Sequence, residues 1–282
     1  MITGIIFILL AIVFLTTARI IVRYILRETE PYAFSWLTQI VDTLIWLPFA
    51  LWSFTFPTEK TAWIVLGING VLWAVVSICS YIAMKGTQLS LKEPLSQSKL
   101  LWGLLIAVFF LHEQPSSYRI IGTIVILIGV SILLWHPERK FGNFSDSGVK
   151  WTLGTAVISA IVSSIDKYSL HWFTPAVYGF FMYLIPTVVL SFFLRGRTQH
   201  IGHLLKRHGK TAILSILLYT GGYYFTLRSF QAVDFTLAYP LLQISTLFTV
   251  IGGIVLLKEH KHLWQKIIAT VVIVAGVILV GF

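Results

Sequence analysis

The sequence predicts an all-α membrane protein of ten transmembrane helices, arranged as two inverted five-helix repeats. Three observations predict this fold: a very apolar composition, ten long apolar segments, and a stretch that occurs twice. Of the 282 residues, 57% are hydrophobic and 11% are charged, and the mean hydropathy is +0.85. Soluble domains carry about 25% charged residues. The chain therefore has too few charges to cover a soluble surface of this size.

A membrane-spanning helix needs about 20 mostly apolar residues. Proline and charged residues separate the apolar segments, as at Glu30-Pro31 and Glu113-Gln114-Pro115. The first segment has no basic residues before it and is longer than a signal-peptide core, so we expect it to be a retained helix. The expected helices are Ile2–Val22, Tyr32–Phe56, Thr61–Lys85, Leu91–Leu111, Ser116–Trp135, Val149–Leu170, Pro175–Leu194, Lys210–Phe230, Phe235–Leu257 and Leu263–Phe282.

The stretch from Lys85 to Leu134 has a second copy. Offsets of 143 to 147 residues, with two small gaps, align the two copies, which indicates an internal duplication. The first copy holds Tyr81, Lys85, Gln88, Pro94, Gln97, Leu111, Glu113, Arg119, Thr123 and Gly129, and the second holds Tyr224, Arg228, Gln231, Pro240, Gln243, Leu257, Glu259, Lys266, Thr270 and Gly276.

The duplication extends back to the first helix, because an offset of 144 pairs Pro31 with Pro175 and Arg23 with Lys167. Five helices per repeat is an odd number, so the second repeat enters the membrane from the opposite side. Many secondary transporters place a binding site between such inverted repeats. We set the boundary in the polar stretch 138–147, giving repeats at 1–142 and 143–282.

The net charge of +10 comes from basic residues that lie between the apolar segments. Sixteen of the 21 Lys and Arg residues flank the connections after the odd-numbered helices. By the positive-inside rule these connections are cytoplasmic, so both termini are expected outside the cytoplasm, in a multi-pass protein of the plasma (inner) membrane. This pattern describes topology and speaks against a nucleic-acid partner. Cys79 is the one cysteine, so an intramolecular disulfide is impossible.

The repeated pattern resembles the EamA-type transporters of the drug/metabolite transporter superfamily over essentially the whole chain. Three features carry the resemblance: Glu93-Pro94-Leu95 and Tyr239-Pro240-Leu241, then Leu111-His112-Glu113 and Leu257-Lys258-Glu259, then Gly129-Val130 and Gly276-Val277. The resemblance implies a central cavity lined by helices one to four and six to nine. The small four-helix relatives carry a proton-coupling glutamate in the first helix, but residues 11–15 here contain no acid.

Polar residues recur every four positions along the third helix, at Asn69, Trp73, Ser77, Tyr81 and Lys85. The eighth helix repeats the pattern at Thr220, Tyr224 and Arg228. Residues at this spacing share one helix face. Since unpaired polar groups are costly in lipid, we expect the stripe to line a cavity; the alternative is hydrogen bonding between packed helices.

Two pairs of cations lie at helix ends, Arg23 with Lys85 and their counterparts Lys167 with Arg228. We expect them to charge the two mouths of the cavity and to favour a carboxylate or phosphate on the substrate. The alternative is that these side chains extend to the membrane interface.

Asp42 and Lys99 break the repeat, since their counterparts are Pro186 and Ser245. Asp42 lies roughly 15 Å and Lys99 roughly 12 Å from one membrane face. Charges at such depth cost about 2.5–3.5 kcal/mol each on insertion scales. Either the two form a structural ion pair, or they are a substrate or proton-coupling site in which Asp42 alternates between partners.

The remaining candidates for substrate binding are Gln39, Trp102, Tyr183 and Gln243. Aromatic residues in this class of protein also serve in interfacial belts and in packing. We expect Asp166 and Lys167 to form a local pair at the end of the sixth helix.

These residues predict a secondary transporter of a small polar or amphipathic organic metabolite that works by alternating access. Catalytic and metal-binding motifs are missing from the sequence, so we expect no enzyme, no cofactor and no metal. The expected partners are a small molecule, with or without a coupling proton or ion, and the lipid bilayer. Alternatives are an importer or lipid-linked phosphate translocator with basic cavity mouths, and a non-transporting receptor or structural subunit.

Overall fold

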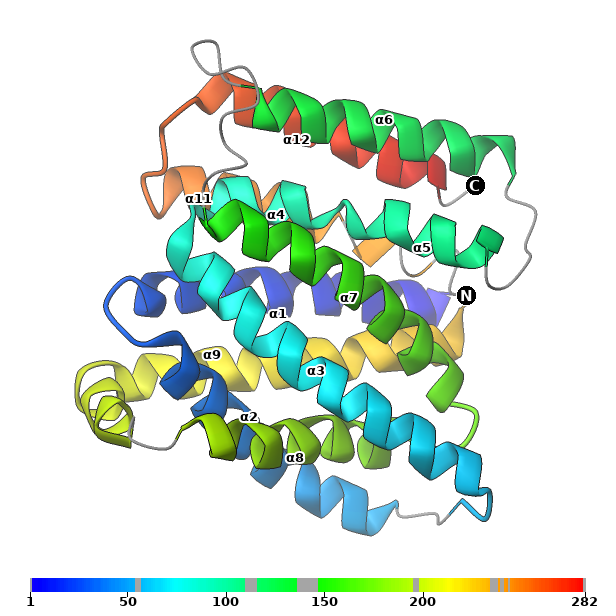
Figure 1. Cartoon of the computed structure of the whole chain (residues 1–282), viewed down its shortest axis with the longest axis vertical. Helices are drawn as coiled ribbons and strands as arrows, with labels where there is room; N and C mark the ends of the chain where they lie inside the picture. The colour runs from blue at the N-terminus through cyan, green and yellow to red at the C-terminus, as the bar shows by residue number, and fades with distance from the viewer. Residues whose placement is uncertain are drawn as a thin grey trace.

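The computed structural model describes residues 2–53, 57–109, 116–135, 147–194, 198–233, 238, 241, 242 and 244–280, and none of these residues forms a strand. Their architecture is all-helical (Figure 1). The helices are α1 (Ile2–Leu26), α2 (Pro31–Trp52), α3 (Lys60–Gly86), α4 (Leu89–Ser96), α5 (Lys99–Phe109), α6 (Ser117–Leu134), α7 (Ser147–Ser169), α8 (Pro175–Phe193), α9 (Thr198–Ala232), α11 (Ser245–Val255) and α12 (Leu263–Val280).

The helix starts follow from local sequence. The Glu30 carboxylate accepts a hydrogen bond from the amide of Ala33 at 2.7 Å, and Pro31 fills the first helical position of α2. Thr174 caps α8 through the amide of Val177 at 3.4 Å, again followed by a proline. A capping side chain satisfies an amide that has no partner within the helix, and proline needs none there.

The structure corrects two expected helices. The expected helix Leu91–Leu111 is divided into α4 and α5, because Pro94 lies inside α4 and the amides of Gln97 and Ser98 bond to carbonyls three residues back. Such bonds tighten the backbone into a 3₁₀-type turn. Helix α9 begins at Thr198 rather than Lys210. Its 35 residues span about 52 Å, which exceeds the roughly 30 Å hydrocarbon layer.

The helices pack in pairs drawn from distant parts of the chain. Helix α1 packs on α9, α3 on α7, α2 on α8, α4 on α11, and α6 on α12. The α6–α12 pair lies along the upper edge of Figure 1. Gly122 and Gly276 make its close approach possible, because a Cβ on either residue would lie 2.7 Å from the carbonyl oxygen of the other.

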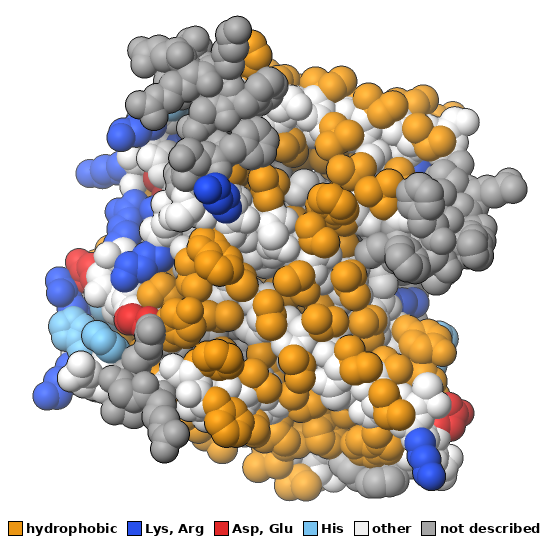
Figure 2. Space-filling view, in the orientation of Figure 1, with side chains coloured by type: hydrophobic (Ala, Val, Ile, Leu, Met, Phe, Trp, Pro, Cys, Tyr) orange, Lys and Arg blue, Asp and Glu red, His pale blue; other side chains and the backbone are white. Residues whose placement is uncertain are grey.

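Six of the described helices are long and apolar enough to cross a membrane, namely α1, α2, α3, α7, α8 and α12. Apolar side chains cover the middle of the surface in Figure 2, and basic side chains gather at its left edge. Both chain ends lie at the opposite edge in Figure 1. The chain is therefore an integral membrane protein of several apolar helices.

Candidate substrate cavity

A cavity of about 260 Å³ lies among helices α1 to α5, α7 to α9 and α11, and the α6–α12 pair does not contribute to its described wall. The wall is mainly polar and aromatic. Its polar and aromatic residues are Arg19, Thr38, Gln39, Asp42, Trp73, Ser77, Ser80, Tyr81, Lys92, Glu93, Ser96, Gln97, Lys99, Thr152, Thr155, Ser159, Ser163, Asp166, Tyr183, Tyr219, Tyr223, Thr226, Phe230 and Ser245.

Seven of the residues proposed from sequence line this cavity. They are Gln39, Asp42, Trp73, Ser77, Tyr81, Lys99 and Tyr183. The others lie elsewhere: Asn69 and Thr220 are buried beside the wall, Trp102 is half-buried, and Lys85, Tyr224 and Arg228 are exposed, while Gln243 lies outside the described residues. The stripe on α3 therefore enters the cavity through its central residues.

Asp42 is fully buried and belongs to α2. Its Oδ1 accepts a hydrogen bond from the Thr220 hydroxyl of α9, and its Oδ2 has no hydrogen-bond partner among the described residues. An ion pair with Lys99, one of the two alternatives left open by the sequence, is therefore not observed. The charged groups that act electrostatically on Lys99 are Arg19, Glu93 and Lys92. Asp42 thus carries a carboxylate whose partner is a neutral hydroxyl.

Asp166 on α7 also differs from expectation, because it does not pair with Lys167. Its Oδ1 accepts hydrogen bonds from Asn69 Nδ2 at 2.9 Å, Trp73 Nε1 at 3.0 Å and the Tyr178 hydroxyl at 2.6 Å. The side chain is almost fully buried. Adjacency in sequence suggested the wrong partner, since Asp166 faces the protein interior and Lys167 faces α9.

Lys167 donates from Nζ to the carbonyl oxygen of Phe230 at 2.7 Å. Arg23, its counterpart in the first half, donates to the carbonyls of Met84 and Lys85. Lys85 in turn donates to the carbonyl of Thr29 at 2.8 Å. These cations hold helix ends that lack further backbone donors. Their action as charges at the cavity mouths stays a prediction.

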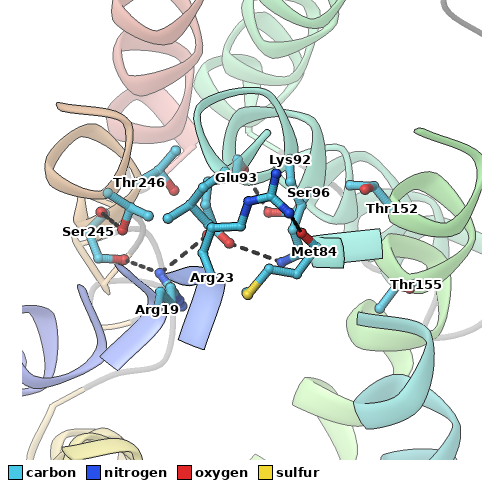
Figure 3. A network of polar contacts seen from close by, with 12 residues as sticks. Arg19, Arg23, Met84, Lys92, Glu93, Ser96, Thr152, Thr155, Ser245 and Thr246 are labelled. Carbon is cyan, nitrogen blue, oxygen red and sulfur yellow. Dashed lines mark hydrogen bonds and ion pairs between the residues drawn. The ribbon is translucent and has the colours of Figure 1, made fainter. Parts of the chain in front are cut away.

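A cluster of charged side chains lies where α1, α4 and α11 meet (Figure 3). Arg19 NH1 lies 3.4 Å from Oε2 of Glu93, and it donates to the Ser245 hydroxyl at 3.1 Å. Lys92 Nζ lies 3.0 Å from Oε1 of the same glutamate. The sequence gives no direct signal for this cluster, because Arg19 is one of many basic residues near a helix end and Glu93 belongs to the repeated pattern as Glu93-Pro94-Leu95.

Sequence reasoning also missed one face of α7, which bears Thr152, Thr155, Ser159, Ser163 and Asp166. Successive members are three or four residues apart, so they lie on one helix face. The same spacing rule that selected the α3 stripe would have found this face. The two threonines bond to carbonyls of their own helix, at Gly148 and Trp151.

Several polar atoms of the cavity wall lack partners within the described residues: Oε1 of Gln39, Oδ2 of Asp42, Oε1 of Gln97 and the Tyr223 hydroxyl. Buried polar groups are nearly always hydrogen-bonded in native proteins. Aromatic rings stand among these atoms, with Trp73 and Tyr183 both packed edge-on against Tyr223 at centroid distances of 5.9 and 5.8 Å. The wall therefore offers both unused hydrogen-bonding capacity and flat apolar surfaces.

Comparisons with known proteins agree with a transport role. The model of the family described as "Sugar transport protein" matches residues 34–282. Two relatives named "Putative sugar uptake protein", from Listeria innocua and Listeria monocytogenes, are each 28% identical over 76% of this chain and 77% of their own length. A protein of the same name from Lactococcus lactis is 25% identical over 83% of this chain and 84% of its own.

The fold is similar to that of a solved crystal structure, with a TM-score of 0.66 over 98% of this chain and 95% of the other, at 15% identity. This similarity shows the fold alone. The family match covers most of the chain, and its members are membrane transporters rather than enzymes. The chain belongs to the sugar transport protein family.

Proposed function

We propose that this protein carries a sugar across the membrane, and that the substrate binds in the cavity between the two halves of the chain. The combination of unpartnered polar atoms and aromatic rings on the cavity wall carries the proposal. A sugar presents hydroxyl groups around its rim and apolar C–H groups on its faces. Ligand sites of this kind combine a few placed polar groups with aromatic walls.

The residues that would bind the sugar come from facing helices. Gln39 of α2 donates to the Ser77 hydroxyl at 2.9 Å, which leaves its Oε1 to accept from a ligand hydroxyl. The hydroxyls of Ser159 and Ser163 on α7 also line the cavity. Trp73 and Tyr183 supply the flat surfaces. Polar residues inside a membrane are costly, and they commonly mark the transport pathway.

Transport would proceed by alternating access in a fold of ten helices, the inverted repeat of the EamA-type resemblance. The packing supports this symmetry. In the two repeats α1 corresponds to α7, α2 to α8, α3 to α9, α4 and α5 to α11, and α6 to α12. When each helix is exchanged for its counterpart, the α1–α9 contact becomes the α7–α3 contact. The contacts α2–α8, α4–α11 and α6–α12 each become themselves. The α1–α11 contact likewise becomes the contact of α7 with α4 and α5. The two repeats would be 1–142 and 143–282.

Asp42 is the proposed coupling residue. It is a buried carboxylate in the cavity wall, its partner is the neutral Thr220, and Oδ2 is unpaired. Burying an unpaired charge is expensive, so binding a proton or a cation would stabilise this site. Import driven by a proton would exchange that proton at Asp42 on each cycle.

The basic edge of the molecule supports an orientation with these loops in the cytoplasm and both termini outside, in the plasma membrane. Import would then carry the sugar toward the basic edge. The cluster around Arg19 favours an alternative function, the translocation of a lipid-linked phosphate. A translocator of this kind would move a lipid from one leaflet to the other, and soluble sugars would not inhibit that movement.

Uptake by proteoliposomes tests the proposal. Labelled sugars of different size and charge would be offered to vesicles with and without the protein, and counterflow would be measured after preloading. Saturable uptake and counterflow of at least one sugar are expected. Sugar binding without flux would indicate a receptor, and neither binding nor flux would overturn the proposed function.

A further inference from the structure

Asp166 of α7 lines the cavity and also bonds to residues of α3 and α8. Asn69 and Trp73 of α3 and Tyr178 of α8 donate to its Oδ1, at 2.9, 3.0 and 2.6 Å. Asn69 and Tyr178 lie behind the cavity wall, so Oδ1 is turned toward the packed helices. Hydrogen bonds from described residues reach only this oxygen. Oδ2 therefore remains for a ligand in the cavity.

The three bonds hold this carboxylate in one orientation. An ionised carboxylate accepts hydrogen bonds at both oxygens and donates none. The three donors are neutral, and Asp166 forms no ion pair with a described residue. A buried charge is costly unless its hydrogen-bonding capacity is used, so ligand hydroxyls that donate to Oδ2 would stabilise it. Hydrogen bonds with one ionised partner are roughly twice as strong as neutral ones.

The wall beside Asp166 combines hydroxyls with aromatic surface. Ser163 lies three residues earlier on the same face of α7 and lines the cavity. The Trp73 ring also lines the cavity and packs edge-on against Tyr223 at a centroid distance of 5.9 Å. The Tyr223 hydroxyl has no hydrogen-bond partner within the described residues. A few placed polar groups beside an aromatic surface are typical of small-molecule sites.

The scaffold does not require polar groups at these positions. By the offsets that align the two halves, 143 for α3 and 144 for α7 and α8, the counterparts of Asp166, Asn69, Trp73 and Tyr178 are Val22, Ala212, Ile216 and Phe34. These four apolar residues are buried and belong to one hydrophobic cluster. An apolar cluster therefore suffices for packing at the equivalent positions. A ligand, rather than the fold, accounts for the carboxylate on the cavity wall.

We propose that Asp166 is a specificity-determining residue of the sugar site. Its Oδ2 accepts hydrogen bonds from one or two hydroxyls of the sugar, while Trp73 and Ser163 contact the rest of the ring. This inference rests on the proposed sugar transport and names a residue that selects the substrate. A site built to hydrogen-bond a hydroxyl rejects an analogue without it, because a buried polar group then stays unpaired. The bound sugar must therefore present a donor at the position that faces Asp166.

Calorimetry on the purified full-length protein in nanodiscs tests this role. Glucose, galactose, mannose, xylose and ribose are compared first, and the tightest binder is then compared with its monodeoxy and deoxyfluoro derivatives. At least one deoxy derivative should bind the wild type about tenfold or more weakly than the parent sugar, a difference of about 1.4 kcal/mol. The fluoro derivative at the same carbon should bind equally weakly, because fluorine cannot donate a hydrogen bond to a carboxylate.

Asp166→Asn changes the contact with the sugar while it keeps the size of the side chain. The amide oxygen retains an acceptor for Asn69, Trp73 and Tyr178, whereas the amide nitrogen replaces Oδ2. The parent sugar should bind this variant about tenfold more weakly than it binds the wild type. The deoxy penalty, the ratio of the two dissociation constants, should fall below about threefold. Asp166→Ser removes the carboxylate altogether and should give the same loss of discrimination.

Two controls separate ligand binding from a structural role. Glu59→Gln alters an exposed carboxylate that also accepts from a tryptophan, Nε1 of Trp172 at 2.9 Å, but lies outside the cavity wall. It should leave the affinity and the deoxy penalty unchanged. Tyr178→Phe removes one bond to Asp166 from behind the wall. It should lower the midpoint of thermal unfolding and keep the tenfold deoxy penalty.

The outcomes distinguish the role of Asp166 from sugar transport itself. A deoxy penalty that persists in Asp166→Asn and Asp166→Ser overturns this role and leaves sugar transport standing. Wild-type binding that no single deoxygenation weakens does the same. Equal weakening of the parent sugar and all its derivatives in these variants assigns Asp166 a structural role and also overturns the proposal. No binding of any of the five sugars by the folded wild-type protein overturns both proposals.

Discussion

Glu259 bonds to Ser90 through two donors: its Oε2 accepts from the amide of Ser90 at 2.9 Å and from the hydroxyl of Ser90 at 2.7 Å. Oε1 of the same carboxylate accepts from the amide of Leu89 at 3.0 Å. A loop residue near the end of the chain thus caps the first turn of α4, more than a hundred residues earlier. This contact explains the glutamate at this position in the second copy of the repeated pattern.

Removing this cap should destabilise the protein. Glu259→Ala leaves two buried amides without their acceptor and removes the ion-pair partner of Arg23, whose Nε lies 3.5 Å from Oε1. Loss of such a buried group costs about 3–5 kcal/mol. The midpoint of thermal unfolding in detergent, followed by size-exclusion fluorescence, should fall clearly. Glu259→Gln retains one acceptor oxygen, so its unfolding midpoint should fall less. Equal unfolding midpoints of the wild type and Glu259→Ala would contradict the capping role.

Asp42→Asn should abolish acid-stimulated uptake. The amide retains the size of the side chain and a partner for Thr220, but it cannot exchange a proton. Uptake into proteoliposomes would be measured with and without an inward pH gradient. Wild type should respond to the gradient, whereas the variant should retain counterflow and lose the response. A gradient response that persists in Asp42→Asn would exclude this residue as the coupling site.

Trp73 should report substrate binding, because its ring lines the cavity and its Nε1 donates to Asp166 at 3.0 Å. In Trp73→Phe the change in tryptophan fluorescence on adding sugar should be largely lost, and affinity should fall, because the smaller ring offers less flat surface to the sugar and no longer holds Asp166 in place. Trp52→Phe is the control, as this side chain is 94% exposed. An undiminished signal in Trp73→Phe would place the sugar elsewhere.

Neighbouring serines on α7 allow a matched comparison. Ser163 lines the cavity, whereas the adjacent Ser164 is exposed and bonds to the carbonyl of Ala160 on its own helix. Ser163→Ala should raise the KM for the sugar about threefold to tenfold, the effect of one neutral hydrogen bond of about 0.5–1.5 kcal/mol. Ser164→Ala should leave KM unchanged. Equal KM values for the two variants would argue against the α7 face as a sugar contact.

Gly276→Ala should disturb the α6–α12 pair. The added Cβ would lie 2.7 Å from the carbonyl oxygen of Gly122 and 2.8 Å from Ile126, so the helices must separate. Overpacking of this kind costs about 1–3 kcal/mol. Gly67→Ala is the control, since its Cβ would meet no atom within 4 Å. The midpoint of thermal unfolding in detergent should fall in Gly276→Ala and stay unchanged in Gly67→Ala.

Much of the fold could be predicted from the chain, because lipid imposes simple rules. Apolar length predicted where the helices lie, and the proline that follows Glu30 or Thr174 marks the start of α2 or α8. The turn at Gln97 and Ser98 was not predicted, although Pro94 lies just before it. A proline in a membrane helix can be accommodated by a bend or by a break, and the packing of neighbouring helices decides which.

The cavity residues were predictable only in part. A four-residue spacing sufficed to select Trp73, Ser77 and Tyr81, since one helix face needs no knowledge of its neighbours. Asp42 and Lys99 stood out because the second half lacks them, but the sequence left open whether they pair with each other. A charge in a sequence does not specify its partner, because the partner lies on another helix.

The sequence by itself determined the class of protein, the run of apolar helices and the duplicated pattern, because these depend on composition, length and local spacing. The tertiary structure alone decided that Asp166 faces Asn69 and Tyr178, that Glu93 serves Arg19 and Lys92, and that Glu259 caps α4. Apart from the contact between the neighbours Lys92 and Glu93, each of these contacts joins different helices or loops. Their geometry follows from how the helices pack, which local sequence does not encode.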